Sequence, residues 1–414
     1  MAKILISTLG TGDYKESIYQ LGSQQSTSVK FIQEALVQML SSDWSIKNGD
    51  CAKILCTQGA ITKHWDNLSQ CLSQYKISSV QTSIPDGFNE KELWKIFQII
   101  FDLFTDGDEV WFDLTHSFRS IPMLVLTVIS YARVMKNIKV MGIFYGAWEA
   151  KTNGITPIFF LDQFVKLQDW TNASQDFLAF GEIGLLKQLL DQESREILKN
   201  GRNAEAEATK NLASSLENYF SITLSKNDIA EIVSFKNVRN KIQDFQNNRG
   251  EQFPAFSNLF DRVSEKSLEF HENDWGNIFT AARWCADHGK ILNAYSILLE
   301  GVISIALLLI GKDPQEKKES IDLRQLVIPA SEVVLGAKKI DEIIGDRSVI
   351  EKLVQVFDQA SAQAVSGLAQ RRNGLFHGGT GKAQLQKDVL TSINTSIDIL
   401  RDWFKQKDPK VITS

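Results

Sequence analysis

Lys3-Ile-Leu-Ile-Ser-Thr-Leu-Gly-Thr-Gly12 begins with a short apolar run of residues that favour β-structure and stops at a Gly-Thr-Gly turn. The run predicts a buried strand over Lys3–Leu9, because strands that are covered on both faces read as nearly continuous hydrophobic stretches. The two glycines that follow allow a tight turn into the next element of the fold.

The same succession of apolar strand, polar loop and helix continues until about residue 165. Asn89 followed by Glu92 is typical of a capping box at the start of a helix. Further strands are expected at 51–57, 80–84, 109–114, 138–145 and 157–161, and helices within 29–40, 89–104 and 120–135. Strands that alternate with helices predict a mostly parallel sheet with helices on both faces.

Polar loops follow these predicted strands, and they should share one edge of the sheet, where ligands of such folds bind. Gly10 and Gly12 let backbone N–H groups approach a phosphate closely. Thr115, His116 and Arg119 add hydroxyl, imidazole and guanidinium donors. This set of donors predicts an anionic ligand that carries phosphate.

Two other interpretations of these loops remain open. Gly10 and Gly12 can form a strand-to-helix turn that binds nothing, and the polar groups of 115–119 can simply cap the next helix. A nicotinamide dinucleotide site is disfavoured, because the fingerprint needs a third glycine and an acidic ribose partner, and both are missing.

From about residue 165 to the end, the apolar spacing changes to the period of an α-helix. We therefore expect an all-helical second part. Helices are expected at 175–190, 205–224, 228–247, 275–287, 292–310, 348–370 and 382–405.

One stretch of this helical part combines groups that suit RNA cleavage: Gly367-Leu-Ala-Gln-Arg-Arg-Asn-Gly-Leu-Phe-His-Gly-Gly379. Histidine transfers protons near neutral pH, and arginine holds phosphate oxygens with a planar set of donors. Arg372, Asn373 and His377 are therefore the candidate catalytic residues. The alternative is an ordinary helix end, which favours basic residues followed by glycine.

Helix geometry limits how these residues can act together. Positions i and i+5 of an α-helix point in well-separated directions, so Arg372 and His377 cannot share a face of a regular helix. They can converge only if the helix breaks, for example at Gly374, or if two copies of the segment meet across a two-fold axis.

Arg372-Asn373-x3-His377 resembles the Arg-x4-His motif of HEPN ribonucleases. The stretches 4–14 and 113–122 resemble the two signature loops of CARF domains, the Rossmann-like sensors of type III CRISPR accessory proteins. Ile84-Pro-Asp-Gly87, 92–97 and Tyr145-Gly-Ala147 also resemble that family, whereas Ser117 stands where it usually has glycine. The similarity covers the chain from its start to about Trp170 and resumes at the C-terminal motif.

The resemblance implies a CARF sensor at 1–165, a helical connecting region at 166–270 and a HEPN ribonuclease domain at 271–414. It implies a metal-independent endoribonuclease for single-stranded RNA that uses no cofactor and is activated by a cyclic oligoadenylate. Slow cleavage of the activator is a further expectation, with Thr115 and Ser117 positioning its 2′-hydroxyl. The expected effector-binding residues are Leu9, Gly10, Thr11, Gly12, Thr57, Gln58, Thr115, His116, Ser117, Phe118, Arg119, Tyr145 and Gly146.

Since one copy of the motif supplies one histidine, we expect a homodimer or a higher homo-oligomer. The alternative function is a non-catalytic, nucleotide-sensing regulator that acts through a partner protein. That function predicts that replacing Arg372 or His377 changes nothing.

Charge and composition narrow the class of protein further. The net charge of −5 over 414 residues argues against a broad nucleic-acid-binding surface, so RNA would be held at a local basic site. The four cysteines show no metal-ligand spacing and predict reduced thiols. We expect no signal peptide and no membrane span, because Glu300 interrupts the longest apolar run, and therefore a cytoplasmic protein.

Overall fold

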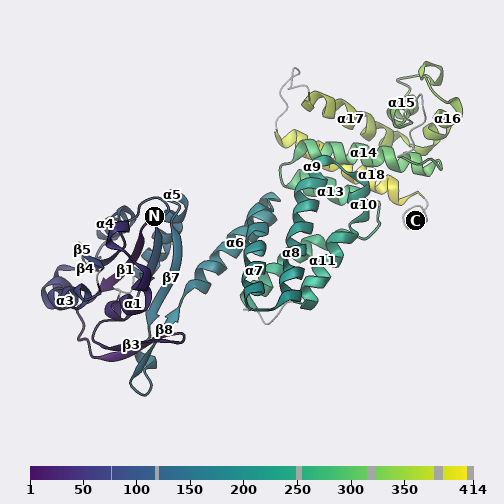
Figure 1. The fold of residues 1–414 in the computed structure, drawn as a ribbon. Coiled ribbons are helices and arrows are strands. Elements are labelled where there is room, and N and C mark those ends of the chain that lie inside the picture. Colours follow the sequence, from purple (N-terminus) through teal and green to yellow (C-terminus); the bar gives the residue numbers. More distant parts are fainter. Residues whose placement is uncertain (76, 117–120, 249–253, 315–322, 377–385, 408–414) are drawn as a thin grey trace. The chain divides into compact units, whose positions relative to one another are not determined.

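The computed structural model describes residues 1–75, 77–116, 121–248, 254–314, 323–376 and 386–407. The chain forms two compact units, Met1–Lys166 and Leu167–Ser414. The first unit is a sheet with helices and the second is all-helical, as Figure 1 shows, so the predicted fold class is confirmed.

The first unit contains an eight-stranded sheet with the order β3-β2-β8-β7-β6-β1-β4-β5. The strands β5-β4-β1-β6-β7 are parallel to one another, whereas β8 is antiparallel to β7 and β3 is antiparallel to β2. The strands are β1 (Lys3–Leu9), β2 (Ser17–Leu21), β3 (Gln24–Val29), β4 (Cys51–Cys56), β5 (Ser78–Ser83), β6 (Glu109–Asp113), β7 (Lys139–Gly146) and β8 (Ile155–Phe160).

The strand order reverses at β1. The strands β4 and β5 lie on one side of β1, and the later strands β6 and β7 lie on its other side. Ligands of open α/β sheets bind beyond the carboxyl ends of the strands at such a switch point. The loops after β1 and β6 therefore flank the expected binding crevice.

Helices cover both faces of this sheet. The side chains of β1 therefore alternate between two hydrophobic cores, one on each face. Leu5 packs in the core that includes α1 (Ile32–Leu40) and α3 (Asp66–Ser73). Ile4 and Ile6 pack in the core that includes α4 (Glu90–Asp102) and α5 (Ile121–Met135).

Asn89 is the N-cap of α4 as predicted, but the predicted capping box is incomplete, because the Glu92 carboxylate binds the Asn89 side chain and the preceding backbone rather than Asn89 N. Asn89 Oδ1 accepts a hydrogen bond from Glu92 N at 3.0 Å, and Asn89 Nδ2 donates to Glu92 Oε1 at 2.7 Å. Glu92 Oε2 also accepts from Gly87 N at 2.9 Å, which fixes the loop before the helix.

The hairpin of β2 and β3 was not predicted. Its sequence, from Ser17 to Val29, is rich in glutamine, serine and threonine and lacks the apolar alternation of a strand. The strand β2 is instead held in the sheet by parallel pairing with β8, in which Ile18 lies opposite Ile155.

In the second unit, one contiguous core extends from Ala173 to Phe404. The longer helices that build it are α6 (Asp162–Phe180), which begins in the first unit, α7 (Gly184–Lys199), α8 (Asn203–Glu217), α11 (Lys236–Asn248), α13 (Asn277–Asp287), α14 (Ile291–Leu309), α15 (Arg324–Val334), α16 (Arg347–Val356), α17 (Gln359–Phe376) and α18 (Gln386–Lys405). The helix α12 (Pro254–Ser267) also belongs to this unit.

Among the described residues, α14 is the one helix long and apolar enough to cross a membrane. Its most apolar window is 72% buried inside the unit. Such burial is typical of a core helix, which packs its apolar residues against protein.

Three predicted helices were wrong in extent. The predicted helix 228–247 is two helices, α10 (Ile229–Ser234) and α11, because Phe235 between them has a positive φ of +43°. The predicted helix 348–370 is two helices, because Phe357 is extended between α16 and α17 and the carboxylate of Asp358 accepts from Ser361 N at 2.7 Å. The predicted helix 175–190 is broken at Gly181, whose φ of +65° is positive. Glycine favours this left-handed region of backbone conformation.

The four cysteines are free, as predicted, and Cys51, Cys56 and Cys285 are buried. Burial raises the pKa of the Cys56 thiol to about 12 and likewise that of the Cys285 thiol to about 12. Both thiols therefore stay protonated and unreactive at neutral pH.

Candidate functional site

A buried carboxylate connects the strand ends at the switch point of the sheet. Asp113, at the end of β6, is 1% exposed and accepts hydrogen bonds from Ser7 Oγ at 2.6 Å, from Thr115 N at 3.0 Å and from Thr115 Oγ1. Thr115 Oγ1 in turn accepts from Gly146 N at 2.8 Å. These bonds join the ends of β1, β6 and β7.

Burial raises the pKa of Asp113, and the hydrogen bonds from Ser7 and Thr115 act in the opposite direction. A Cβ atom at Gly146 would lie 2.3 Å from Ile32 Cδ1, so only glycine fits at this position without movement of its neighbours. The carboxyl end of β7 thus needs glycine for close packing.

The loop that follows β1 is held by hydrogen bonds to the side chain of Tyr14. Gly10 N donates to Tyr14 Oη at 2.8 Å, and Tyr14 Oη donates to Gly10 O at 3.2 Å. The Tyr14 ring meets the rings of His116 and His64 edge-on, with centroid distances of 4.5 and 4.8 Å. Burial raises the pKa of Tyr14 far above its ordinary value, so the hydroxyl stays neutral.

The helical segment after β4 also contacts the loop that follows β1. This segment includes a π-helical turn, η3 (Ile61–Trp65), and such turns are frequent at functional sites. His64 Nε2 lies 2.8 Å from Gly12 O, and Lys63 Nζ donates to Thr11 O at 2.9 Å. Neither Lys63 nor His64 was predicted from the sequence to belong to this site.

His116 lies beside this network with an unsatisfied ring nitrogen. Its Nε2 atom is buried and has no hydrogen-bond partner among the described residues. Burial lowers the pKa of His116 below its ordinary value, and the nearby Asp113 carboxylate opposes that shift. The imidazole is therefore neutral at pH 7, and ligand phosphate can supply the missing partner.

The structure places the other expected effector-binding residues as follows. Leu9 is 3% exposed, so its side chain belongs to the core and only its backbone can contact a ligand. Thr11, Gly12 and Gln58 are exposed, and Thr57 immediately precedes α2 (Gln58–Ala60). The half-buried Tyr145 places its Oη 3.5 Å from Glu149 Oε2. Ser117, Phe118 and Arg119 lie outside the described residues.

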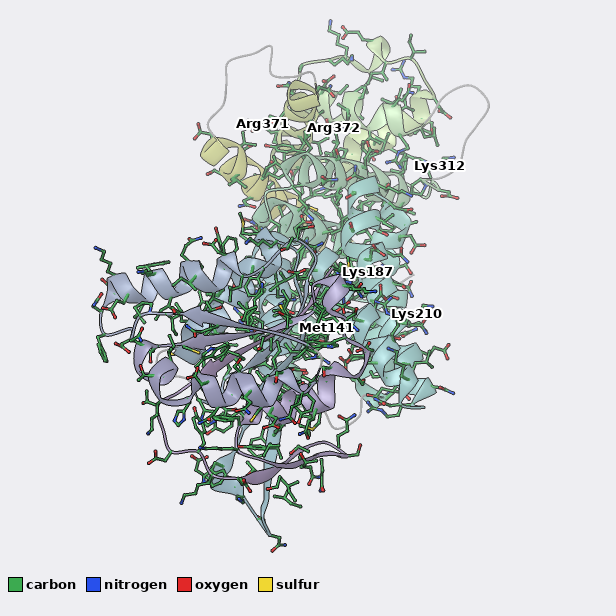
Figure 2. The ribbon with its side chains drawn as sticks, turned by 60° about the vertical axis from the view of Figure 1, so that its left-hand side comes forward. Met141, Lys187, Lys210, Lys312, Arg371 and Arg372 are labelled. Carbon is green, nitrogen blue, oxygen red and sulfur yellow. The ribbon has the colours of Figure 1, made fainter. Side chains whose placement is uncertain are left out.

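In the helical unit, the candidate catalytic arginine lies in the last turns of α17, where Figure 2 labels it beside Arg371. Of the two ways in which Arg372 and His377 could converge, a helix break at Gly374 is not seen, since α17 continues as a regular helix to Phe376. Asn373 is exposed, and His377 lies outside the described residues.

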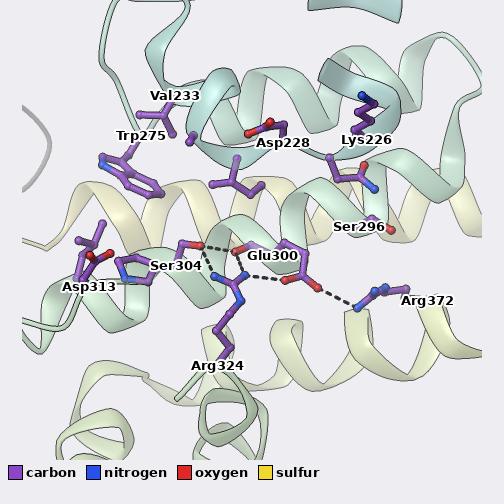
Figure 3. A pocket seen from close by; sticks show the side chains of 15 residues that line it. Lys226, Asp228, Val233, Trp275, Ser296, Glu300, Ser304, Asp313, Arg324 and Arg372 are labelled. Atoms are coloured by element: carbon purple, nitrogen blue, oxygen red, sulfur yellow. Dashed lines mark hydrogen bonds and ion pairs between the residues drawn. The ribbon is translucent and has the colours of Figure 1, made fainter. Parts of the chain in front are cut away.

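Glu300 holds Arg372 in place. Arg372 Nη1 donates to Glu300 Oε1 at 3.1 Å, while Glu300 Oε2 accepts from Arg324 Nη2 at 2.6 Å. Ser304 Oγ accepts from Arg324 Nη1 at 3.0 Å and donates to Glu300 O at 2.9 Å (Figure 3). One carboxylate therefore bridges two guanidinium groups that come from α15 and α17.

The sequence analysis treated Glu300 only as an interruption of an apolar run and did not single out Arg324. The signal was present, because a lone carboxylate in the middle of an apolar core helix needs a positively charged partner. The sequence does not reveal which residue is that partner, because Arg324 and Arg372 lie 24 and 72 residues away from Glu300 along the chain.

Arg372 and Glu300 line a recess of about 650 Å³ in the helical unit. A guanidinium fixed by a carboxylate can present its remaining face to a phosphate at low entropic cost. Among the residues that the structure describes, no three His, Cys, Asp or Glu side chains gather as a metal-ligand set.

No family model matches this chain. The chain is 24% identical over 220 residues to a CRISPR-associated protein of Methanocaldococcus jannaschii. The similar region covers 52% of this chain and 32% of that protein, so the chain spans about a third of the length of the relative it matches. This similarity supports a CRISPR-related function.

Proposed function

We propose that this chain is an endoribonuclease of type III CRISPR defence that a cyclic oligoadenylate activates. In this proposal the first unit is a CARF sensor and the helical unit is a HEPN nuclease. The observation that carries it is the anchored arginine: Arg372, in the stretch that resembles the HEPN motif, is held by Glu300 at the wall of a recess.

The proposed reaction is an intramolecular transesterification. The 2′-oxygen of the RNA loses its proton and attacks the adjacent phosphorus, the bond to the 5′-oxygen breaks, and that oxygen takes up a proton. Arg372 stabilises the negative charge of the phosphorane, and His377 transfers protons. The products are a 2′,3′-cyclic phosphate and a 5′-hydroxyl.

Cleavage is expected to persist in EDTA and to leave a 2′,3′-cyclic phosphate or its hydrolysis product. The motif offers guanidinium and imidazole groups, and the nearby Glu300 carboxylate already bridges two arginines. Gel analysis of end-labelled RNA fragments measures both properties. Products that retain a 5′-phosphate, or activity that disappears with EDTA, contradict this proposal.

The active unit is proposed to be at least a homodimer. Because α17 is regular through Gly374, the structure gives no break there that would bring the two motif residues of one copy together, and we propose that two copies across a two-fold axis supply the acid and the base. Sedimentation under assay conditions measures the oligomeric state. Full turnover by a monomeric species contradicts the dimer.

In the sensor, phosphates of the activator are proposed to meet the backbone N–H groups of 10–12 and the side chains of Thr115 and His116. The network around Asp113 supports this arrangement, because it fixes Thr115 beside the loop that follows β1. Slow hydrolysis of the activator by this unit is also part of the proposal, with Thr115 as the group that positions the 2′-hydroxyl.

Binding of the activator is expected to be accompanied by proton uptake at pH values between the lowered pKa of His116 in the free protein and its higher pKa in the complex. His116 is neutral in the free protein because burial lowers its pKa, and an adjacent phosphate raises that pKa. Affinity should therefore increase as the pH falls through this range. Calorimetric titrations in two buffers with different ionisation enthalpies measure the uptake.

His116→Gln is the control for this experiment, because Asp113, His64 and Tyr14 also face the imidazole and remain in the variant. The difference in heat between the two buffers should shrink in His116→Gln. An equal difference in the wild type and the variant assigns the proton to another group.

A further inference from the structure

The recess beside Arg372 has two chemically distinct ends. In Figure 3, Trp275 and Val233 lie at one end and Arg372 at the other, with Ser304 and Glu300 between them. The wall opposite α14 is formed by the segment from Lys226 to Val233. The recess has a volume of about 650 Å³. Small-ligand sites usually measure about 300–1,000 Å³, so the recess is large enough to be one.

One polar atom in this wall lacks a partner. Asn227 lines the recess, and its Oδ1 atom is buried without a hydrogen-bond partner among the described residues. A buried amide oxygen in this state destabilises the protein until a donor reaches it. The unpaired oxygen therefore points to a ligand that carries an N–H or O–H group.

The backbone around Asn227 is held firmly. Asn227 closes α9 (Leu224–Lys226) in the left-handed conformation, with φ of +54°, directly after the π-helical turn η5 (Asn218–Thr223). Asn293 Nδ2 donates to Leu224 O at 3.1 Å and to Ser225 O at 3.3 Å. The amide of Asn227 is thus presented by a fixed turn, as a recognition group requires.

The charges of the lining are balanced. Lys226, Arg324 and Arg372 face three carboxylates of Asp228, Glu300 and Asp313, and Glu300 already binds two of these arginines. A polyanion gains little from such a surface. A neutral, flat group with one phosphate at the Arg372 end fits both the charge pattern and the indole of Trp275.

The geometry points to a nucleotide subsite: we infer that the recess receives unpaired nucleobases of the RNA strand, next to the phosphate that is cleaved. One base donates a hydrogen bond to Asn227 Oδ1 while its phosphate lies at Arg372, and the neighbouring base of the strand stacks on Trp275 at the other end of the recess. Stacking on an aromatic side chain tolerates any base, so Asn227 is the residue that discriminates among bases. This inference rests on the proposed ribonuclease function.

The test uses the full-length protein and uncleavable 2′-deoxy oligonucleotides that differ in one base. Asn227→Gly removes the amide and keeps the left-handed backbone, which glycine adopts freely. Asn273→Gly is the matched control, because Asn273 also has a positive φ, of +53°, and is not part of the recess lining. Trp275→Ala removes the stacking face, and Trp275→Phe preserves one.

We expect the wild type to bind the four oligonucleotides with different affinities. Asn227→Gly should reduce those differences and weaken the best complex about 10-fold, Trp275→Ala should weaken all four about 10-fold, and Asn273→Gly and Trp275→Phe should stay within about 2-fold of wild type. Unchanged binding in Asn227→Gly and Trp275→Ala overturns the subsite, as does a wild type that binds none of them.

The two proposals fail in different ways. If the wild type cleaves RNA but the Asn227 and Trp275 variants retain its base preference, the subsite is wrong and the ribonuclease function stands. If the oligonucleotides bind as expected while no RNA is cleaved with any activator, the recess is a nucleic-acid site and the ribonuclease function is wrong.

Discussion

Replacing His377 with alanine is expected to lower the rate of RNA cleavage by about 10²–10⁴-fold, because one general acid–base group typically contributes that much. Affinity for the cyclic activator should stay at the wild-type value, since this residue belongs to the helical unit and the activator is proposed to bind the first unit. Cleavage is measured as initial rates on labelled single-stranded RNA at saturating activator, and affinity by calorimetry.

Arg372 provides the companion variants for this prediction. Arg372→Ala should abolish most cleavage and leave activator affinity unchanged. Glu300→Gln should lower cleavage by up to about 10²-fold, because a misplaced group in an active site costs this much. Glu351→Gln is the matched control, since its ion pair with Arg347 at 3.0 Å is exposed.

Wild-type cleavage by both His377→Ala and Arg372→Ala contradicts the enzyme and favours the alternative, a nucleotide-sensing regulator that acts through a partner protein. A loss of cleavage in Glu351→Gln that equals the loss in Glu300→Gln shows that the effect is general rather than due to the position of Arg372.

The second large effect is expected for Asp113→Asn, which should raise the activator concentration needed for half-maximal cleavage about 10-fold or more. The amide nitrogen of asparagine cannot accept hydrogen bonds, so Ser7 Oγ or Thr115 loses its acceptor in a buried site. A loss of about 1.4 kcal/mol of binding free energy lowers the affinity by a factor of ten. Maximal cleavage at saturating activator should remain near the wild-type rate.

The control for Asp113→Asn is Asp106→Asn, which changes an exposed carboxylate in the same unit. Arg119→Ala should behave like Asp113→Asn if its guanidinium binds phosphate as the loop sequence predicts. A variant of Asp113 that needs no more activator than wild type contradicts the proposed sensor site.

The parts of the fold that the sequence predicted are those with a strong local signal. Continuous apolar runs identified β1, β4 and β7, and the pair Asn89 and Glu92 identified the start of α4. The hairpin β2–β3 escaped prediction because its polar residues form strands only through pairing with β8, which lies more than a hundred residues away.

The residues of the candidate sites fall into the same two groups, those with a local signal in the sequence and those without one. Motifs that are contiguous in the sequence, such as Gly10–Gly12 and Arg372-Asn373, could be recognised without a structure. The role of Lys63 could not, because it depends on a contact with Thr11 O across the fold, and for Glu300 the sequence showed the need for a cationic partner but not that Arg372 is one of its partners. The π-helical turns η3 and η5 also carry no sequence signal, although they position residues at both sites.

Coupling between the two units is the central claim of this account. A ligand can activate the nuclease only if it binds one arrangement of the paired sensors better than another and thereby changes the separation of the two copies of Arg372 and His377. A cyclic oligonucleotide with rotational symmetry suits a site shared by two copies across a two-fold axis.

The most direct measurement is the cleavage rate of labelled single-stranded RNA by the purified full-length chain, with and without each of a series of cyclic oligoadenylates. The account predicts slow cleavage without activator and a large increase with one ring size, in the presence of EDTA. Equal rates with and without every cyclic oligoadenylate contradict it.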